Sequence, residues 1–508
     1  MRIVGLALAL FVSAAACTAL LDTDSLQTKS GTAGAGGTGG QSDAMTDAPD
    51  ATGKTCTSDT DCLPGLEIDG CTVYACGPAE DRTCRPPRPN SGALGIVSAG
   101  WVETVMTADD IGYPSLLVDG GDIIMAVWHR TGSTSDVLLR KYPAYPQTGA
   151  GLELSAIANG MFKSYASSPG MIVKQAVPRR VRLLLAAERT GDAGAGAGMR
   201  LVDVDVPAIG NNVKLSAMQP ALADLGVTGY DTRPRLFAPR LLANGLAEPT
   251  GMWIQQGKFY YFDGAATQEA YSAKKVIGYS PLSGTTGVHA ALETAMTDAD
   301  GGSTGPSRTE LWSNGSAALA SLDGDQPGIR HGVTSTYANE SGSSINLVAW
   351  SFEPKAGVPA LNYRVALCAL MSCTSLALTG QPDALPAMFP EMTSAPVSMT
   401  DRDVLQSFEI IFADTTQPTL ADSALFASVA RFNIPSPDLT KGSSTPMNPP
   451  LFIVDLAQGP LGAAAGDVLG PSSVAITRDG QLMVAWVVHP TPSTAVLRAR
   501  RYLVKTCP

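Results

Sequence analysis

Two clusters of arginine are the residues in this sequence whose spacing could perform a specific chemistry. They comprise Arg179, Arg180 and Arg182, and Arg233, Arg235 and Arg240 within "TRPRLFAPR". Guanidinium groups that converge on one point bind a carboxylate through paired N–H donors, so either cluster could hold the carboxylate of an acidic sugar. We favour the simpler interpretation that these arginines are solvated charges at the ends of strands.

Histidines and acidic loops are weaker candidates for chemistry. The four histidines are His129, His289, His331 and His489. His129 and His489 follow a tryptophan in similar strands, and we expect them at the same end of neighbouring repeats, where two histidines alone make a poor metal site. The segments 298–302 and 323–328 are similar to calcium loops but lack the oxygen ligands of a dedicated site. We therefore expect no cofactor, with calcium as the remaining alternative.

The composition excludes some classes of function. The 508 residues contain 35 Lys and Arg against 46 Asp and Glu, which gives a net charge of −11. Binding to nucleic acid or to an anionic membrane needs a basic face, so we expect neither. The HExxH and GxxxxGK[ST] motifs of metalloproteases and nucleotide-binding proteins do not occur. The 52 glycines and 36 prolines indicate an all-β protein with many turns.

The N-terminus has the features of an export signal. Arg2 precedes an apolar run over 3–12 and then "SAAAC". This end resembles a bacterial lipoprotein signal, which implies a signal peptide over 1–16 and a lipid on Cys17, although Ala14 stands where Leu is usual. The alternative is ordinary cleavage after the alanines, which leaves a soluble secreted protein. We expect an exported protein of the outer membrane or cell surface, held at the membrane through its lipid anchor only.

Two small regions follow the signal. Residues 17–55 carry Cys17 and then mainly Gly, Ser, Thr, Ala and Asp, which cannot form a core, so we predict a disordered, flexible tether. We predict that residues 56–90 form a disulfide-rich module. A zinc site is the alternative, but its CxxC pairs and nearby histidines are missing. Its pattern C-T-S-D-x-D-C resembles short cysteine-rich repeats in predicted surface lipoproteins of myxobacteria and their relatives. The module cysteines are Cys56, Cys62, Cys71, Cys76 and Cys84.

The rest of the chain, 91–508, contains repeated strands. Three apolar segments include a tryptophan: "IIMAVWHR" at 123–130, "INLVAWSF" at 345–352 and "LMVAWVVH" at 482–489. A strand that is apolar on both faces must be covered on both sides, as the inner strands of propeller blades are. We predict a six- or seven-bladed β-propeller in which Trp128, Trp350 and Trp486 pack one blade against another. Tandem β-sandwiches are the alternative.

Weaker repeats and turn residues support this fold. Segments 181–207, 258–280 and 408–434 each contain a strand, a polar or Gly-rich loop and a second strand. Asp-Gly between two apolar runs, as at 119–120 and 479–480, is typical of a hairpin. The best helical candidate is 289–300, "HAALETAMTDAD".

The remaining cysteines and the chain ends predict how the ring closes. "LNYRVALCALMSCTSLALTG" resembles a bacterial propeller repeat that ends in a C-x4-C pair, and its spacing predicts a disulfide between Cys368 and Cys373 across a hairpin. The last repeat ends one strand short, so we expect 100–106 to complete the blade that begins at Pro471. Cys507 should then bond to a module cysteine. We predict Cys84, the nearest in sequence to the closing strand, and leave open how the other four pair.

These predictions favour binding over catalysis. Propellers present long loops from rigid strands, so we expect non-catalytic binding of an extracellular protein or glycan. The alternative is a propeller hydrolase acting on extracellular glycans. The S-x-D-x-G-x-T-W pattern of sialidase-like blades does not occur. Arginines or paired carboxylates that converge on the propeller axis would favour the hydrolase, whereas apolar residues with Ser and Thr would favour binding.

Overall fold

The computed structural model describes the strands of the chain and the turns and loops next to them. All of the named elements in this part are β-strands, and none of its residues forms a helix long and apolar enough to cross a membrane. Residues 49–508 form one compact unit. The described residues are 53–56, 62, 71–91, 94–98, 102–144, 151–154, 161–175, 179–191, 197–218, 234–237, 250–271, 275–282, 287–295, 307–314, 320–322, 329–337, 345–353, 362–369, 372–376, 387–396, 401–411, 423–433, 443–446, 451–455 and 468–508.

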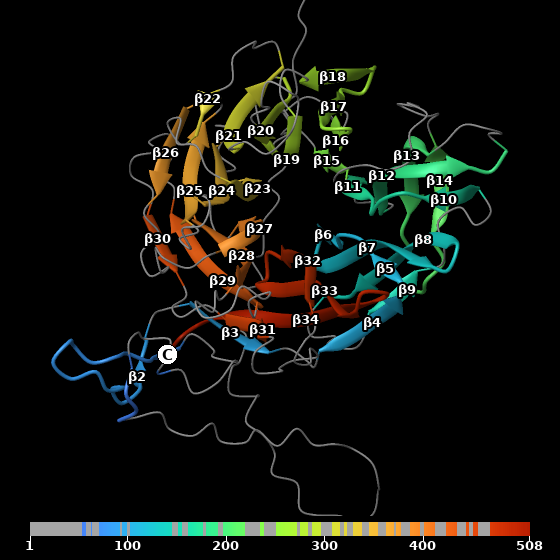
Figure 1. Ribbon diagram of the computed structural model, residues 1–508. Coiled ribbons are helices and arrows are strands. Elements are labelled where there is room, and N and C mark those ends of the chain that lie inside the picture. The colour runs from blue at the N-terminus through green and yellow to red at the C-terminus, as the bar shows by residue number, and fades with distance from the viewer. Residues whose placement is uncertain are drawn as a thin grey trace, which may run out of the picture. The chain divides into compact units, whose positions relative to one another are not determined.

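Seven antiparallel sheets of four or five strands form a ring in the described part of the chain (Figure 1). One strand of each sheet lies innermost, and innermost strands of neighbouring sheets contact each other at six of the seven junctions. At the junction of the third and fourth sheets, the innermost strand of the fourth contacts the second and third strands of the third sheet. The fold is therefore an all-β propeller with seven blades, which confirms the predicted fold class. The innermost strands are β6 (Ser115–Asp119), β11 (Gly170–Gln175), β15 (Arg235–Phe237), β19 (Lys275–Leu282), β23 (Ile329–Tyr337), β27 (Ala387–Pro396) and β32 (Val468–Ile476).

Blades 1 to 3 follow one another along the chain. Blade 1 contains β5 (Asp110–Ile111), β6 (Ser115–Asp119), β7 (Asp122–Thr131), β8 (Thr134–Tyr142) and β9 (Leu152–Leu154). Blade 2 contains β10 (Phe162–Tyr165), β11 (Gly170–Gln175), β12 (Arg180–Arg189), β13 (Gly198–Asp205) and β14 (Lys214–Met218). Blade 3 contains β15 (Arg235–Phe237), β16 (Thr250–Gln255), β17 (Lys258–Phe262) and β18 (Thr267–Tyr271).

Blades 4 to 6 continue in the same order. Blade 4 contains β19 (Lys275–Leu282), β20 (His289–Ala295), β21 (Ser307–Ser313) and β22 (Ala320–Ser321). Blade 5 contains β23 (Ile329–Tyr337), β24 (Ile345–Glu353), β25 (Asn362–Ala369) and β26 (Ser372–Leu376). Blade 6 contains β27 (Ala387–Pro396), β28 (Asp401–Ile411), β29 (Ser423–Asn433), β30 (Ser443–Pro446) and β31 (Leu451–Asp455).

Blade 7 is built from both ends of the propeller sequence. Its C-terminal strands are β32 (Val468–Ile476), β33 (Gln481–Thr491) and β34 (Thr494–Thr506), and β3 (Leu94–Ser98) and β4 (Glu103–Ala108) both pair with β34. The expected closure by 100–106 is therefore confirmed for residues 103–106, and β3 adds a second N-terminal strand. Figure 1 shows these two blue strands beside the red β34.

A disulfide joins the cysteine module to the seam of the ring, which is the part of blade 7 where β3 and β4 pair with β34. Cys507, just after β34, bonds to Cys71, so the predicted bond from Cys84 to Cys507 is wrong. Cys84 instead lies in the buried interior of the module, bonded to Cys62, and Cys56 bonds to Cys76. Cys71 precedes the short strand β1 (Thr72–Val73), which pairs with β2 (Arg88–Pro89). Position along the chain was a poor guide because the module folds back on itself.

Cys368 and Cys373 form a disulfide within blade 5. They face each other as a pair across β25 and β26, with their Cα atoms 4.1 Å apart. The bond encloses one hairpin turn and does not cross between blades. Cys368 lies in the buried core beside Trp350.

The tryptophans of the repeated motif lie between blades, but they do not all face the same way. Trp350 packs against Leu311 and other residues of blade 4, and Trp486 packs against Val429 and other residues of blade 6. Trp128 instead packs against blade 2, where its Nε1 donates to the carbonyl oxygen of Tyr165 at 2.8 Å. "AVW" has one residue more than "AW" between alanine and tryptophan, and in a strand a shift of one residue turns the side chain to the other face.

The expected helix at 289–300 is wrong in the described part of that segment. Residues 289–295 form β20, the second strand of blade 4, and all seven are buried. Alanine and glutamate favour helix in isolation, but here the strand is covered on both sides by blades 3 and 5. Blade 4 is also the blade whose central strand matches none of the repeats in the sequence.

Other predictions fall on residues outside the described part. They include the signal peptide at 1–16, Cys17, most of the tether at 17–55, and both acidic segments, 298–302 and 323–328.

Candidate functional site

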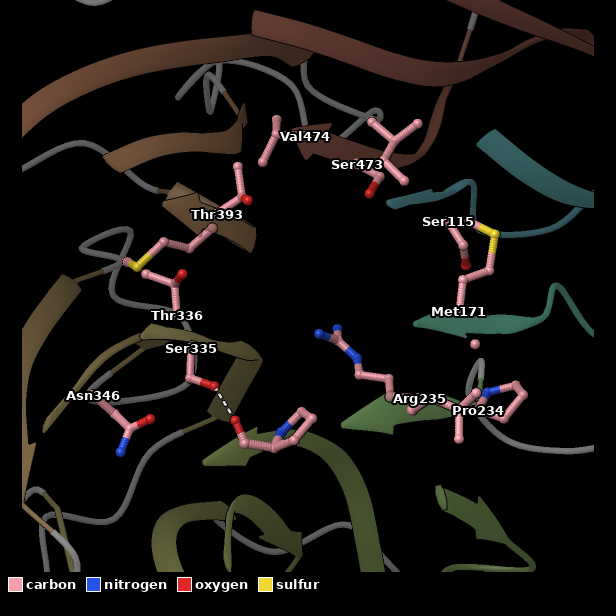
Figure 2. Close-up of a pocket in the computed structure, with 15 residues that line it drawn as sticks. Ser115, Met171, Pro234, Arg235, Ser335, Thr336, Asn346, Thr393, Ser473 and Val474 are labelled. Carbon is pink, nitrogen blue, oxygen red and sulfur yellow. Dashed lines mark hydrogen bonds between the residues drawn. The ribbon is translucent and has the colours of Figure 1, made fainter. Parts of the chain in front are cut away.

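The candidate site is a cavity on the propeller axis. Its volume is about 290 Å³, and the inner strands of all seven blades contribute to its lining (Figure 2). The lining residues are Ser115, Leu116, Gly170, Met171, Pro234, Arg235, Leu236, Pro281, Ser335, Thr336, Asn346, Met392, Thr393, Ser473 and Val474. Because the site draws on residues spread from 115 to 474, only the closed ring assembles it.

A short motif at the start of three inner strands places residues in the wall of this cavity. Blades 1 to 3 carry Pro-Ser-Leu at 114–116, Pro-Gly-Met at 169–171 and Pro-Arg-Leu at 234–236. Ser115, Gly170 and Arg235 occupy equivalent positions, each starting the inner strand that pairs with the next strand of its blade. Proline has no backbone N–H to donate to a neighbouring strand, so the position just before a strand begins accommodates it well. The Pro-x-Leu spacing at 114–116 recurs at 234–236, and this repetition is the sequence signal that marks Arg235 as a residue of an inner strand.

The glycine in this motif allows blades 2 and 3 to approach closely. A Cβ atom on Gly170 would lie 2.6 Å from the carbonyl oxygen of Pro234 and 2.8 Å from the backbone nitrogen of Leu236. Both are backbone atoms, so any side chain at 170 would push β15 away. The absence of a side chain at 170 therefore helps to fix Arg235 at the axis.

Arg235 is the charged residue among the described lining. Figure 2 shows its guanidinium extending towards the centre of the ring of lining residues. Its Cζ lies 6.0 Å from the ring centroid of Tyr279 in blade 4, at the outer limit of a cation–π contact. The Tyr279 hydroxyl donates to the carbonyl oxygen of Met252 at 2.7 Å, and Met252 pairs with Arg235 across β15 and β16.

Neutral polar groups make up most of the remaining lining. Ser335 Oγ donates to the carbonyl oxygen of Pro281 at 2.6 Å and lies 2.8 Å from Ser280 Oγ, which ties blade 5 to blade 4 (Figure 2). Ser473 and Asn346 are 4% and 2% exposed. Hydroxyl and amide groups that are buried at a cavity wall can donate to and accept from a ligand that carries hydroxyl groups.

Apart from Arg235, the described lining of the cavity consists of neutral side chains and backbone. Among the described residues around the cavity there is no carboxylate and no histidine. Hydrolysis of a glycosidic bond ordinarily uses two carboxyl groups, one on each side of that bond. The chain has one GxSxG match at 301–305, "GGSTG", but it lies in the β20–β21 connection, outside the described residues.

Among the described residues of the two arginine clusters, Arg235 lines the axial cavity, whereas Arg179, Arg180 and Arg182 do not. Arg179, just before β12 of blade 2, bridges Asp119 and Asp122 of blade 1, at 2.7 and 2.6 Å, and Arg180 pairs with Asp205 at 2.8 Å. Arg235 of the second cluster reaches the cavity, and the other two members, 233 and 240, fall outside the described residues. Arg179 therefore links blade 2 to blade 1, and Arg180 links two strands within blade 2.

Arg182 departs from the expected solvated charge because it is buried. Its Nε and Nη2 donate to the two carboxylate oxygens of Asp203 at 2.6 and 3.0 Å, and Lys174 Nζ lies 3.3 Å from Asp203 Oδ2. Burial alone would raise the pKa of Asp203, but the hydrogen bonds and charges of Arg182 and Lys174 outweigh it and hold that pKa below 3.8.

Replacing Asp203 should therefore weaken the fold in a pH-dependent way. We expect Asp203→Asn to lower the free energy of unfolding at pH 7 by about 1.5 to 3 kcal/mol, because a charged hydrogen-bonded pair is lost. The carboxylate stabilises the fold above its unfolded-state pKa near 4, and this contribution disappears as the pH falls through the lower folded-state pKa. The difference between the two proteins in urea unfolding should shrink below pH 4; a constant difference would contradict the assignment.

The histidines do not form a metal site in the described part of the chain. His129 pairs with Asp136 across β7 and β8, and His489 pairs with Val468 across β33 and β32, so both lie near the C-terminal end of the second strand of neighbouring blades. Burial lowers the pKa of His129. Neither lines the cavity. The sulfur atoms of Cys56, Cys62 and Cys84 lie within 4.8 Å of one another, but all three are in disulfides.

Comparisons with known proteins identify no family. No protein-family model and no curated protein matches the sequence. A protein of unknown function from Dyadobacter fermentans is 10% identical, with a TM-score of 0.34 over 80% of this chain and 99% of that one. A sialidase from Trypanosoma rangeli is also 10% identical, with a TM-score of 0.36 over 81% of this chain and 60% of its own.

A further similarity is equally distant. A PL25 ulvan lyase is 10% identical, with a TM-score of 0.42 over 78% of this chain and 95% of the lyase. Similarities of this strength carry no argument about activity. The resemblance to myxobacterial surface lipoproteins therefore rests on sequence motifs alone.

Proposed function

We propose that this protein is an exported lipoprotein of the cell envelope whose propeller binds an extracellular glycan or protein without catalysis, and that the axial cavity receives the ligand. The observation that carries this proposal is the cavity wall. All seven blades contribute to it, and its described residues are hydroxyl, amide and apolar side chains with a single arginine. Such a wall can orient a polar ligand, but it offers no acid and base pair.

The disulfides support an extracellular location. Four bonds join all eight cysteines of the described residues. Disulfides persist in oxidising compartments outside the cytosol. Together with the export signal in the sequence, this favours a protein that works at the cell surface.

Filling the cavity should abolish binding. Thr393 lies on the inner strand β27, and its side chain faces the cavity (Figure 2). We expect Thr393→Trp to remove saturable binding of the detergent-solubilised full-length protein to arrayed bacterial glycans and envelope proteins, because the indole would occupy the ligand's space. Thr134→Trp, at the exposed β7–β8 hairpin, is the matched control and should bind normally.

The same experiment tests the hydrolase alternative. Each glycan that binds is incubated with the protein, and new reducing ends are measured. We expect none. Release of product that Thr393→Trp abolishes would establish an enzyme and overturn the non-catalytic proposal, and unchanged binding by Thr393→Trp would exclude the cavity as the site.

The anchor is tested separately at Cys17. We expect Cys17→Ser to abolish incorporation of a fatty-acid analogue and to move the protein from the membrane to the soluble exported fraction, since lipid is the proposed attachment. Metabolic labelling followed by fractionation measures both effects. A wild-type protein that takes up no label would contradict the lipoprotein assignment and leave the binding proposal unaffected.

A further inference from the structure

We propose that the axial cavity binds a single sugar ring that carries one carboxylate, with the guanidinium of Arg235 paired to that carboxylate. This inference rests on the proposed function and names the chemical class of its ligand. It follows from the position of Arg235, the neutral polar groups around it and the size of the cavity.

Arg235 is positioned to bind from the wall of the cavity. It lies on the inner strand β15, and its side chain extends into the open space among the lining residues (Figure 2). Strand pairing with Met252, the nearby Tyr279 ring and the close approach of Gly170 all fix this position. A guanidinium carries five N–H donors, so it can keep contacts within the fold and still present two parallel donors to a carboxylate.

The charge of the site indicates a monoanion. Arg235 is the charged side chain among the described lining residues. One guanidinium neutralises one carboxylate, whereas a phosphate monoester carries nearly two negative charges at pH 7 and would leave an unpaired charge in a partly enclosed site. A planar carboxylate also matches the planar donor fork better than a tetrahedral group does.

The remaining wall suits a hydroxylated ring. Ser115, Thr336, Thr393 and Ser473 come from four blades and face the same space as Arg235 (Figure 2). Sugar hydroxyls both donate and accept hydrogen bonds, as these side chains do. A volume of about 290 Å³ lies at the small end of the range for ligand sites, which fits one ring.

Matched pairs of acids and esters test this inference. Glucuronate and galacturonate are titrated against full-length protein in detergent by calorimetry, together with their methyl esters, which keep every hydroxyl but lose the charge. We expect at least one acid to bind about 10- to 100-fold more tightly than its ester, since a charged hydrogen-bonded pair is lost in the ester. Arg235→Met should remove that difference, and Arg235→Lys should restore only part of it.

Controls separate this inference from the proposed function. Arg130→Met removes the same charge from an exposed position on β7 and should leave the preference for the acid unchanged. Equal binding of acid and ester, or no saturable binding of either acid, overturns the assignment of a carboxylated sugar. Loss of array binding in Thr393→Trp would still uphold the proposed function in that event. Tighter binding of inorganic sulfate than of both acids would also overturn the assignment.

Discussion

Replacing Cys71 and Cys507 together by serine should lower the free energy of unfolding by up to about 5 kcal/mol. This disulfide joins residues 436 positions apart, so it closes the longest loop of the four described bonds. In the chain-entropy account a cross-link restricts the unfolded chain, and the restriction grows with the length of the closed loop. The bond also holds the cysteine module beside β34, which forms the seam of the ring.

The hairpin disulfide provides a matched control. Cys368 and Cys373 are only 5 residues apart, so replacing both by serine should cost much less in guanidinium unfolding followed by tryptophan fluorescence. If the Cys71/Cys507 variant were no less stable than the Cys368/Cys373 variant, the seam bond would have no special role in holding the ring closed.

A strand could be predicted from sequence wherever its apolar residues correspond to the faces that are buried in the fold. Val484 and Trp486 pack towards blade 6, while Met483 and Ala485 pack towards blade 1, so β33 had to be apolar on both faces. The same criterion fails for β20, where the sequence "HAALETA" has a helical composition and only the flanking blades impose a strand. Local preference is a weak guide when both faces of a segment are covered by residues distant in sequence.

The candidate site was harder to predict for a related reason. Ser115 and Ser473 are 358 positions apart in number, yet both face one cavity because equivalent inner strands surround the axis. Neither residue belongs to a catalytic motif. The sequence places Arg235 in a cluster of arginines, but its position at the axis depends on the close approach of Gly170 in the preceding blade, a contact between segments distant in sequence.

Trp486→Ala should lower the free energy of unfolding by about 3 to 5 kcal/mol. The side chain is 0% exposed and lies among residues of blades 6 and 7, including Leu425 and Val484. Removing the indole takes away its buried apolar surface and leaves a cavity that the rigid strands on both sides cannot close. The loss should appear as a lower midpoint in guanidinium unfolding with an unchanged slope.

Two comparisons show whether the packing between blades causes that loss. Ile209→Ala changes a side chain that is 94% exposed and should alter the stability by less than about 0.5 kcal/mol. Trp128→Ala should cost less than Trp486→Ala, because Trp128 is only half-buried and faces blade 2 from the opposite side of its strand. Since the motifs "AVW" and "AW" look alike in sequence, equal losses at the two positions would mean that the one-residue offset has no energetic consequence. A larger loss at Trp128 would contradict the assignment of Trp486 to the core between blades 6 and 7.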